Sequence, residues 1–114
     1  MNYLDFYYKA LMVLDNIKRV ELNNSYFQTN CLGGINSNNV TNFTLTGINI
    51  SNTGSDCNMF NLNDTDNLIL NDIVIENITT NDVVFNVGNS NNLELNNLKA
   101  KSNRGKLFDI SQNQ

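Results

Sequence analysis

The chain contains no histidine, no proline and no tryptophan, and it has only two cysteines. Without histidine and with so few thiols, it lacks the Cys/His ligand sets of a zinc site. No apolar stretch approaches the roughly 20 residues that a membrane-spanning helix needs. Positive charge is scarce, with 7 Lys and Arg against 11 Asp and Glu and a net charge of -4. This balance argues against a nucleic-acid partner and against an anionic membrane surface.

A signal peptide is also missing from the first 16 residues. A basic start is lacking, and charged residues interrupt the apolar run at Asp5, Lys9 and Asp15. This absence says little if the chain is a segment of a larger protein. The small basic run near the C-terminus is interpreted as a solvated strand edge; it consists of Lys99, Lys101, Arg104 and Lys106.

Asparagine dominates the composition, with 26 copies among 114 residues. Such a density indicates either a disordered polar tract or a repeat whose turns need residues tolerant of left-handed backbone. Hydrophobic residues still make up 40% of the chain and are regularly spaced. The repeat is therefore the favoured interpretation.

An internal repeat runs through the sequence: an apolar-x-apolar triplet, two turn residues and a second triplet. Its copies are Val20–Phe27, Phe43–Ile50, Leu68–Ile75 and Leu93–Ala100, at offsets of 23, 25 and 25 residues. A further triplet starts eight residues before each copy and once more near the end of the chain, at Met12, Ile35, Phe60, Phe85 and Phe108. Length changes between repeats collect in one place, the loop that follows the second triplet of each copy.

Each triplet is predicted to be a short strand with two side chains inward and one outward, because side chains alternate along a strand. Three such strands per coil make an all-β parallel β-helix of about four to five coils of 23–25 residues, forming a single domain. We expect coils near 12–34, 35–59, 60–84 and 85–107, a partial coil at 108–114, and either a partial coil or an N-terminal cap at 1–11. In this register one continuous buried column consists of Leu22, Leu45, Leu70 and Leu95.

The residues at the corners and on the outside fit this interpretation. The second residue of each two-residue corner is of a type that accepts positive φ, and these residues are predicted to form a turn ladder of Asn24, Gly47, Asp72 and Asn97. One outward column is expected to be a structural ladder of polar side chains, made of Asn36, Asn61, Asn86 and Asp109.

Few residues are candidates for chemistry. Cys31 and Cys57 lie 26 residues apart in equivalent loops of adjacent coils, so they form either a structural disulfide or a pair of reduced thiols. Asn-x-Ser/Thr sequons allow glycosylation at six positions, Asn23, Asn39, Asn42, Asn49, Asn63 and Asn77. Of these, Asn49 is the outward residue of a predicted strand, where a glycan would be exposed.

The acidic residues Asp64, Asp66 and Asp72 suggest an oxygen-rich calcium loop, but the segment lacks the glycine and the distal glutamate of an EF-hand. A solvated loop is the simpler interpretation. Asp64, Asp66 and Asp82 fall in different loops, so they do not converge as a general acid/base pair would. We expect no catalytic residue, no metal site and no cofactor.

The coil pattern resembles right-handed parallel β-helices of the pectin-lyase-like type over almost the whole chain. Within that class, Phe27-Gln28-Thr29-Asn30 followed by Gly33-Gly34-Ile35 is similar to the FxxN and GG-[AILV] repeat of polymorphic outer-membrane proteins. The resemblance implies a large surface protein. The later coils lack a second Gly-Gly, and no residue matches the catalytic or calcium-binding residues of the pectin-lyase-like enzymes.

The sequence thus predicts a non-enzymatic structural or adhesive β-helix segment of a secreted or cell-surface protein. The coil pattern is interrupted at both ends, which predicts a segment of a longer chain or a unit that stacks end to end into a filament. Its expected partners are other copies of itself or neighbouring coils, with carbohydrate as a further candidate. The alternatives are a polysaccharide-binding or polysaccharide-cleaving β-helix and a phage tail-spike segment, which would be trimeric.

Overall fold

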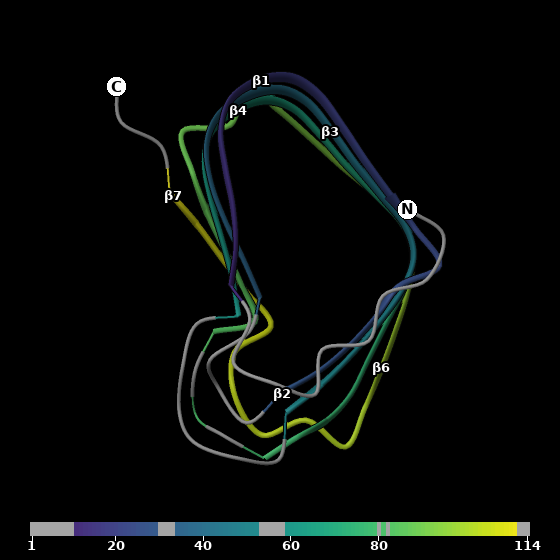
Figure 1. Ribbon diagram of the computed structural model, residues 1–114. Coiled ribbons are helices and arrows are strands. Elements are labelled where there is room, and N and C mark those ends of the chain that lie inside the picture. Colours follow the sequence, from purple (N-terminus) through teal and green to yellow (C-terminus); the bar gives the residue numbers. More distant parts are fainter. Residues whose placement is uncertain (1–10, 30–33, 53–58, 80, 82, 112–114) are drawn as a thin grey trace.

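The structure is a computed structural model that describes residues 11–29, 34–52, 59–79, 81 and 83–111 (Figure 1). This part of the chain consists of strands joined by turns and loops. The strands are β1 (Leu11–Asn23), β2 (Tyr26–Thr29), β3 (Gly34–Asn52), β4 (Phe60–Ile78), β5 (Phe85–Gly88), β6 (Asn92–Lys101) and β7 (Phe108–Ser111).

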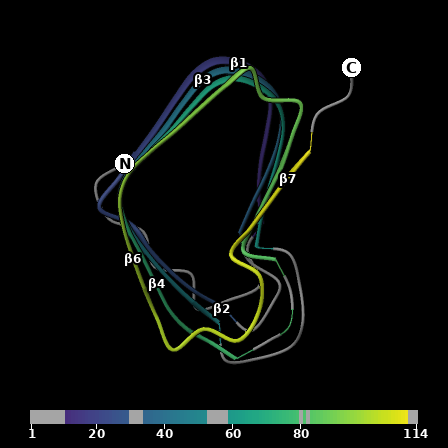
Figure 2. The same ribbon diagram turned by 180° about the vertical axis from the view of Figure 1, so that it is seen from behind.

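All strand pairs are parallel and belong to one sheet with the path β1-β3-β4-β5-β7, while β2 pairs with β3 and β6 with β4. Seen along its axis from either end, the chain winds around a common interior, and successive turns lie behind one another (Figures 1 and 2). The predicted all-β parallel solenoid is confirmed. It completes about three turns rather than four to five coils. On the face that holds the leucine column, four strands stack and are separated by three steps, and β7 adds a fifth strand on one other face only. The predicted number also includes partial coils at both ends.

The register of the stack agrees with the predicted leucine column. Leu22 pairs with Leu45, Leu45 with Leu70, and Leu70 with Leu95. Because side chains alternate along each strand, a slip of one residue would move the whole apolar set to the outside. The buried column therefore fixes the register of every coil.

The strands are longer than the predicted triplets, because ladder pairing continues around the corners. β3 and β4 each have 19 residues and include all three triplets of their coils. In the other coils the pairing is interrupted at a corner or a loop, so β2, β5 and β7 have only four residues each. Hydropathy in the sequence predicts which side chains point inward, whereas the ends of the strands are set by the backbone hydrogen bonds.

Two columns of left-handed residues bend each coil. The predicted corner residues Asn24, Gly47, Asp72 and Asn97 have φ of 54, 68, 53 and 65°. The sequence analysis missed a second column with the same spacing, in which Asn16, Asn39, Asp64 and Asn89 have φ of 57, 60, 52 and 55°. Asparagine, aspartate and glycine tolerate this conformation better than other residues do, which explains why they recur at the corners.

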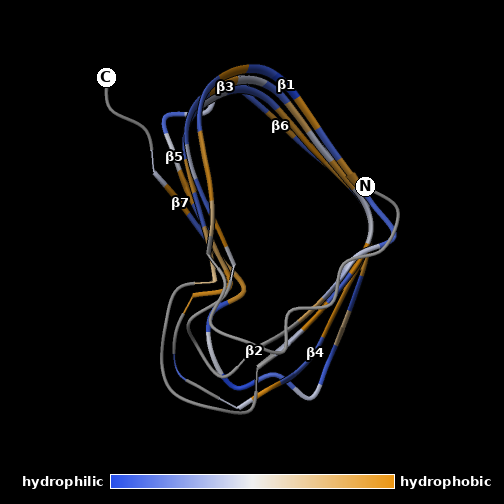
Figure 3. Cartoon of the chain, in the orientation of Figure 1, coloured by the Kyte–Doolittle hydropathy of each residue, from blue (hydrophilic) through white to orange (hydrophobic). Residues whose placement is uncertain are grey.

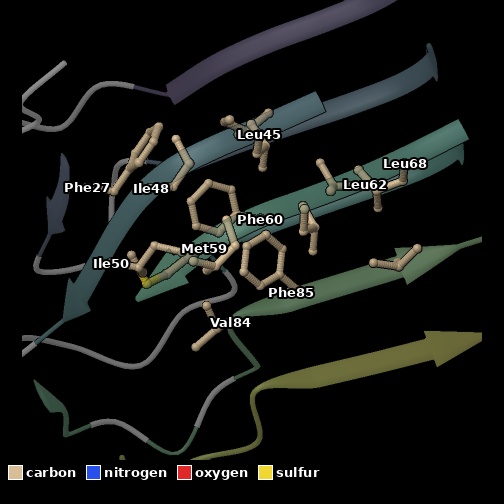
Figure 4. Packing of buried hydrophobic residues seen from close by; sticks show 14 of the residues in the cluster. Phe27, Leu45, Ile48, Ile50, Met59, Phe60, Leu62, Leu68, Val84 and Phe85 are labelled. Carbon is tan, nitrogen blue, oxygen red and sulfur yellow. The ribbon is translucent and has the colours of Figure 1, made fainter. Parts of the chain in front are cut away.

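The interior is an apolar core filled by like side chains from successive coils (Figure 4). Phe60 and Phe85 stack with ring centroids 4.7 Å apart, Phe85 and Phe108 stack at 5.3 Å, and Phe27 meets Phe60 edge to face at 5.1 Å. Hydrophobic and hydrophilic residues alternate along the coils (Figure 3). Each coil therefore buries its apolar residues against the coils above and below it.

Several predictions fall outside the described residues. Cys31 and Cys57 both lie there, so the structure does not test the disulfide, and so do Gly33, Asn30 and Asp82. The choice between a partial coil and a cap over residues 1–11 lies almost entirely there too.

Gly34 is a position where the fold requires glycine. Its φ is +145°, and an added Cβ would lie 1.8 Å from the backbone carbonyl oxygen of Met59, which accepts the Ile35 amide at 3.0 Å. We expect Gly34→Ala to lower the free energy of unfolding by roughly 3 kcal/mol, because the backbone of the next coil must move. Chemical denaturation checks this value. Gly88→Ala is the matched control, since its Cβ would come closest to the movable Asn63 side chain, with the Ser111 hydroxyl at an ordinary contact distance of 3.8 Å. Equal losses of stability would contradict this explanation.

Ser37 interrupts an otherwise apolar inward column, between Leu14 and Leu62. The residue is buried, and its hydroxyl finds no hydrogen-bond partner among the residues that the structure describes. We expect Ser37→Ala to raise the free energy of unfolding by about 1 kcal/mol, because an unpaired buried hydroxyl is removed. Thermal melting of Ser25→Ala provides the comparison. Ser25 is equally buried but donates to the Asn23 carbonyl at 3.3 Å, so this variant should gain nothing.

Candidate functional site

The outer face between the two corner columns has the most regular surface chemistry on the molecule. It consists of three stacked columns, which we call the amide face: Arg19, Asn42, Asn67 and Asn92; Glu21, Thr44, Ile69 and Glu94; and Asn23, Thr46, Asn71 and Asn96. Residues of each column lie one rung apart, so strand spacing places them about 4.8 Å from one another.

Side-chain amides link these rungs by hydrogen bonds. Asn92 Nδ2 donates to Asn67 Oδ1 at 2.8 Å, and Asn67 Nδ2 donates to Asn42 Oδ1 at 2.9 Å. In the third column, Asn96 donates to Asn71 at 2.8 Å and Asn71 to Thr46 at 3.5 Å. An amide can both donate and accept, so each asparagine continues the chain of hydrogen bonds to the next coil.

Other ladders run outside this face. In the first corner column, Asn97 Nδ2 donates to Asp72 Oδ1 at 2.9 Å. In the second corner column, Asn39 donates to Asn16 at 2.8 Å. The predicted outward column pairs in register from Asn36 to Asn61, Asn86 and Asp109; within it Asn86 donates to Asn61 at 3.4 Å.

A shallow hollow of about 610 Å³ lies on the amide face, lined by Asn42, Asn67, Leu68, Ile69, Asn91, Asn92, Leu93 and Glu94. A second hollow of about 300 Å³ adjoins it, where Arg19 Nε donates to Glu21 at 3.1 Å. The pKa of Arg19 is raised mainly by its hydrogen bond to Glu21 and, to a smaller extent, by the negative charge of Glu21. The hollows thus offer neutral amides, a few apolar residues and charged side chains, which is a surface suited to hydroxyl-rich ligands.

The carboxylates of the amide face are poorly placed for joint acid/base work. Glu21 and Glu94 belong to one column and are separated by Thr44 and Ile69, which is three rung steps or roughly 14 Å. Paired carboxylates in glycoside hydrolysis lie about 5–9.5 Å apart. These two glutamates therefore do not form such a pair.

The candidate calcium residues do not converge either. Asp66 accepts from Asn91 at 3.0 Å and Asp72 accepts from Asn97, so each engages the next coil. Asp64 occupies a corner with positive φ. In the described ranges, no group of three or more Cys, Asp or Glu side chains could hold a metal ion.

The sequon asparagines occupy varied surroundings. All six side chains are at least partly exposed. Asn39 and Asn42 belong to amide ladders, Asn77 lies at a corner with a φ of 57°, and Asn49 points outward from β3. A glycan at Asn42 would replace ladder hydrogen bonds. One at Asn49 would leave every described side-chain hydrogen bond in place.

The C-terminal end of the stack is the second candidate site; it consists of β6, which lies on what we call the terminal rung, and β7, which starts the next rung. Within the described part of the chain, β6 pairs only with β4, and β7 only with β5. Leu95 and Ile110 are 43% and 51% exposed, although the equivalent Leu70 and Leu62 one or two coils earlier are fully buried. The predicted basic run lies at this end of the stack, where Lys106 contacts Asp109 at 3.8 Å.

Comparisons with known proteins add no relative: no family model, no curated protein and no solved structure matches the chain. The described residues include no helix that is both long and apolar enough to cross a membrane.

Asn67 is the central member of its ladder, since it donates to Asn42 and accepts from Asn92. We expect Asn67→Ala to lower the free energy of unfolding by about 1–2 kcal/mol, because two hydrogen bonds between coils are lost. Urea denaturation with Asn36→Ala as the matched control tests this, since Asn36 is also an outward strand asparagine but its side chain has no hydrogen bond to another described residue. Equal destabilisation would show that the ladder contributes nothing.

Proposed function

We propose that this chain is a non-enzymatic structural or adhesive element of a secreted or cell-surface protein, a right-handed β-helix of the pectin-lyase-like type that extends by adding strands to its terminal rung. The observation that carries the proposal is the exposure of inward-register side chains on that rung, with Leu95 at 43%. The added strands come from other copies of the chain or from neighbouring coils of a longer chain.

The terminal rung is incomplete on one side. Leu93, Leu95 and Leu98 continue the apolar columns of β4 in register, and none of the described strands pairs with the other side of β6. The backbone of β6 likewise has one edge without a strand partner in the described structure. Unpaired strand edges and exposed apolar rungs favour the addition of a further strand, so assembly is the activity that this geometry supports best.

The expected location agrees with the surface chemistry. A polar exterior carrying sequon asparagines on exposed positions accommodates glycans, and Asn49 is the best placed of them. A disulfide between Cys31 and Cys57 would join adjacent coils and would suit an oxidising compartment. Both features belong to the proposal that the protein is extracellular or exposed at the cell surface.

The rival function is polysaccharide binding or cleavage, and the hollow on the amide face is the observation that favours it. Its amides present donors and acceptors beside Ile69, a combination that can bind sugar hydroxyls and a ring face. A tail-spike segment is a further alternative and would form trimers. Sugar binding or cleavage and trimer formation can each be measured separately from the proposed assembly.

Leu95→Glu tests the assembly proposal. The side chain is partly exposed on the last rung, so we expect the variant to fold. Its carboxylate would have to enter the apolar contact, so the apparent Kd for self-association should rise more than about tenfold. Sedimentation velocity over a range of concentrations measures this, and electron microscopy should show assembled particles only for the parent chain.

Ile69→Glu is the matched control, because it places the same charge on the amide face of the penultimate rung. It should leave assembly unchanged. A strictly monomeric parent chain would contradict the proposal. A screen of soluble glycans and pectins separates the rival, since turnover by the parent chain would overturn the non-enzymatic assignment.

A further inference from the structure

The sequence of β6 reads nearly the same in both directions around its corner. The order from Leu93 to Ala100 is apolar, charged, leucine, asparagine, asparagine, leucine, charged, apolar. The two charged residues are Glu94 and Lys99. Asn97 has a φ of 65°, so the strand bends at the centre of this palindrome. A two-fold axis between Asn96 and Asn97 would place each half of the bent strand opposite the other half of a second copy.

The outward charges of this palindrome lie beside uncharged side chains of the preceding coil. Glu94 stacks on Ile69 and Lys99 stacks on Val74. The nearest polar contact of Glu94 is a 3.4 Å hydrogen bond from Asn96 Nδ2. In the described part of the chain, the ion pairs are Arg19–Glu21 and Lys106–Asp109, so Glu94 and Lys99 are both available to a partner.

We infer that β6 pairs in antiparallel fashion with β6 of a second copy, so that two solenoids join tail to tail. This inference rests on the proposed function and names the partner and the geometry of its terminal contact. The symmetry matches inward residues with inward residues: Leu95 opposes Leu98, and Leu93 opposes Ala100. It also sets Glu94 against Lys99 of the other copy, twice per dimer, as an isologous interface requires.

Antiparallel self-pairing of the equivalent segments in the other coils would bring no opposite charges together. The equivalent outward pairs are Glu21 with Tyr26, Thr44 with Asn49, and Ile69 with Val74. Opposite charges occur only on β6. Stacking head to tail in the register of the coils would instead place Glu94 against Glu21 of the next copy, and like charges across a strand pair are destabilising.

The position of β7 sets the shape of the dimer. β7 pairs with β5 and starts a new rung on a different face, so it protrudes about one strand spacing beyond β6. Two copies whose β6 edges meet must therefore incline their axes toward the shared corner, and a bent rather than a straight particle results.

Charge reversal on the full-length chain tests the pairing. Glu94→Lys sets lysine against lysine at both symmetry-related contacts, and Lys99→Glu sets glutamate against glutamate. Each variant should raise the dimer Kd at least about tenfold, as measured by sedimentation equilibrium at low salt. The double variant with both substitutions should return to within about threefold of the parent chain. Circular dichroism confirms that all three variants fold.

Hydrogen exchange distinguishes the orientation. Tail-to-tail pairing should slow amide exchange over residues 92–101 as protein concentration rises, with no change over residues 11–23. Slower exchange over both ranges, or a double variant as weak as the single ones, would overturn the tail-to-tail arrangement while leaving assembly itself intact. Loss of concentration-dependent assembly in the parent chain would instead overturn the proposed function.

Discussion

The stacking of each side chain on its equivalent one coil away is the interaction on which the rest of this structure depends. A strand spacing of about 4.8 Å is close to the separation of stacked rings, and Phe60, Phe85 and Phe108 stack with interplanar angles of 14 and 11°. Because every column shares one register, a single inserted residue within a face would disrupt all the columns downstream of it. Length changes are therefore confined to the loop that follows the third triplet of each coil.

The same constraint accounts for the abundance of asparagine. A corner residue in a stacked coil must accept positive φ, and it should also bond to the corner above and below. Glycine at Gly47 meets the first demand alone, and aspartate at Asp72 can only accept, as it does from Asn97. Asparagine meets both, since its amide donates in one direction and accepts in the other. On the amide face a residue needs only to hydrogen-bond to the coils on both sides, and asparagine is used there as well.

Much of the fold could be predicted from the sequence, because the repeat offsets and the apolar triplets encode the register directly. The column from Leu22 to Leu95 and the first corner both follow from that spacing. The second corner was missed because the inward column beside it runs Ile17, Val40, Thr65 and Ser90, so its apolar signal fades along the chain. The continuous strands of β3 and β4 could not be predicted either, since backbone hydrogen bonds through a corner leave no trace in hydropathy. Nor could the acidic residues be assigned, because only the stacking shows that Asp66 and Asp72 each bind the next coil's amide rather than a shared ion.

β6 differs from the preceding strands in the side chains that it carries on its outer face. Inside the stack, the outward pair Ile69 and Val74 is half-buried and apolar, whereas Glu94 and Lys99 replace it on the last full coil. Charged residues on an edge strand are a common defence against unwanted pairing. Such a defence needs charge alone and is strongest when all the charges have one sign. Opposite signs placed at equal distances from the corner are a different arrangement, because they repel a parallel neighbour that carries Glu21 and complement an antiparallel copy of the same strand. The order of the charges, rather than their presence, thus makes the edge selective for its partner.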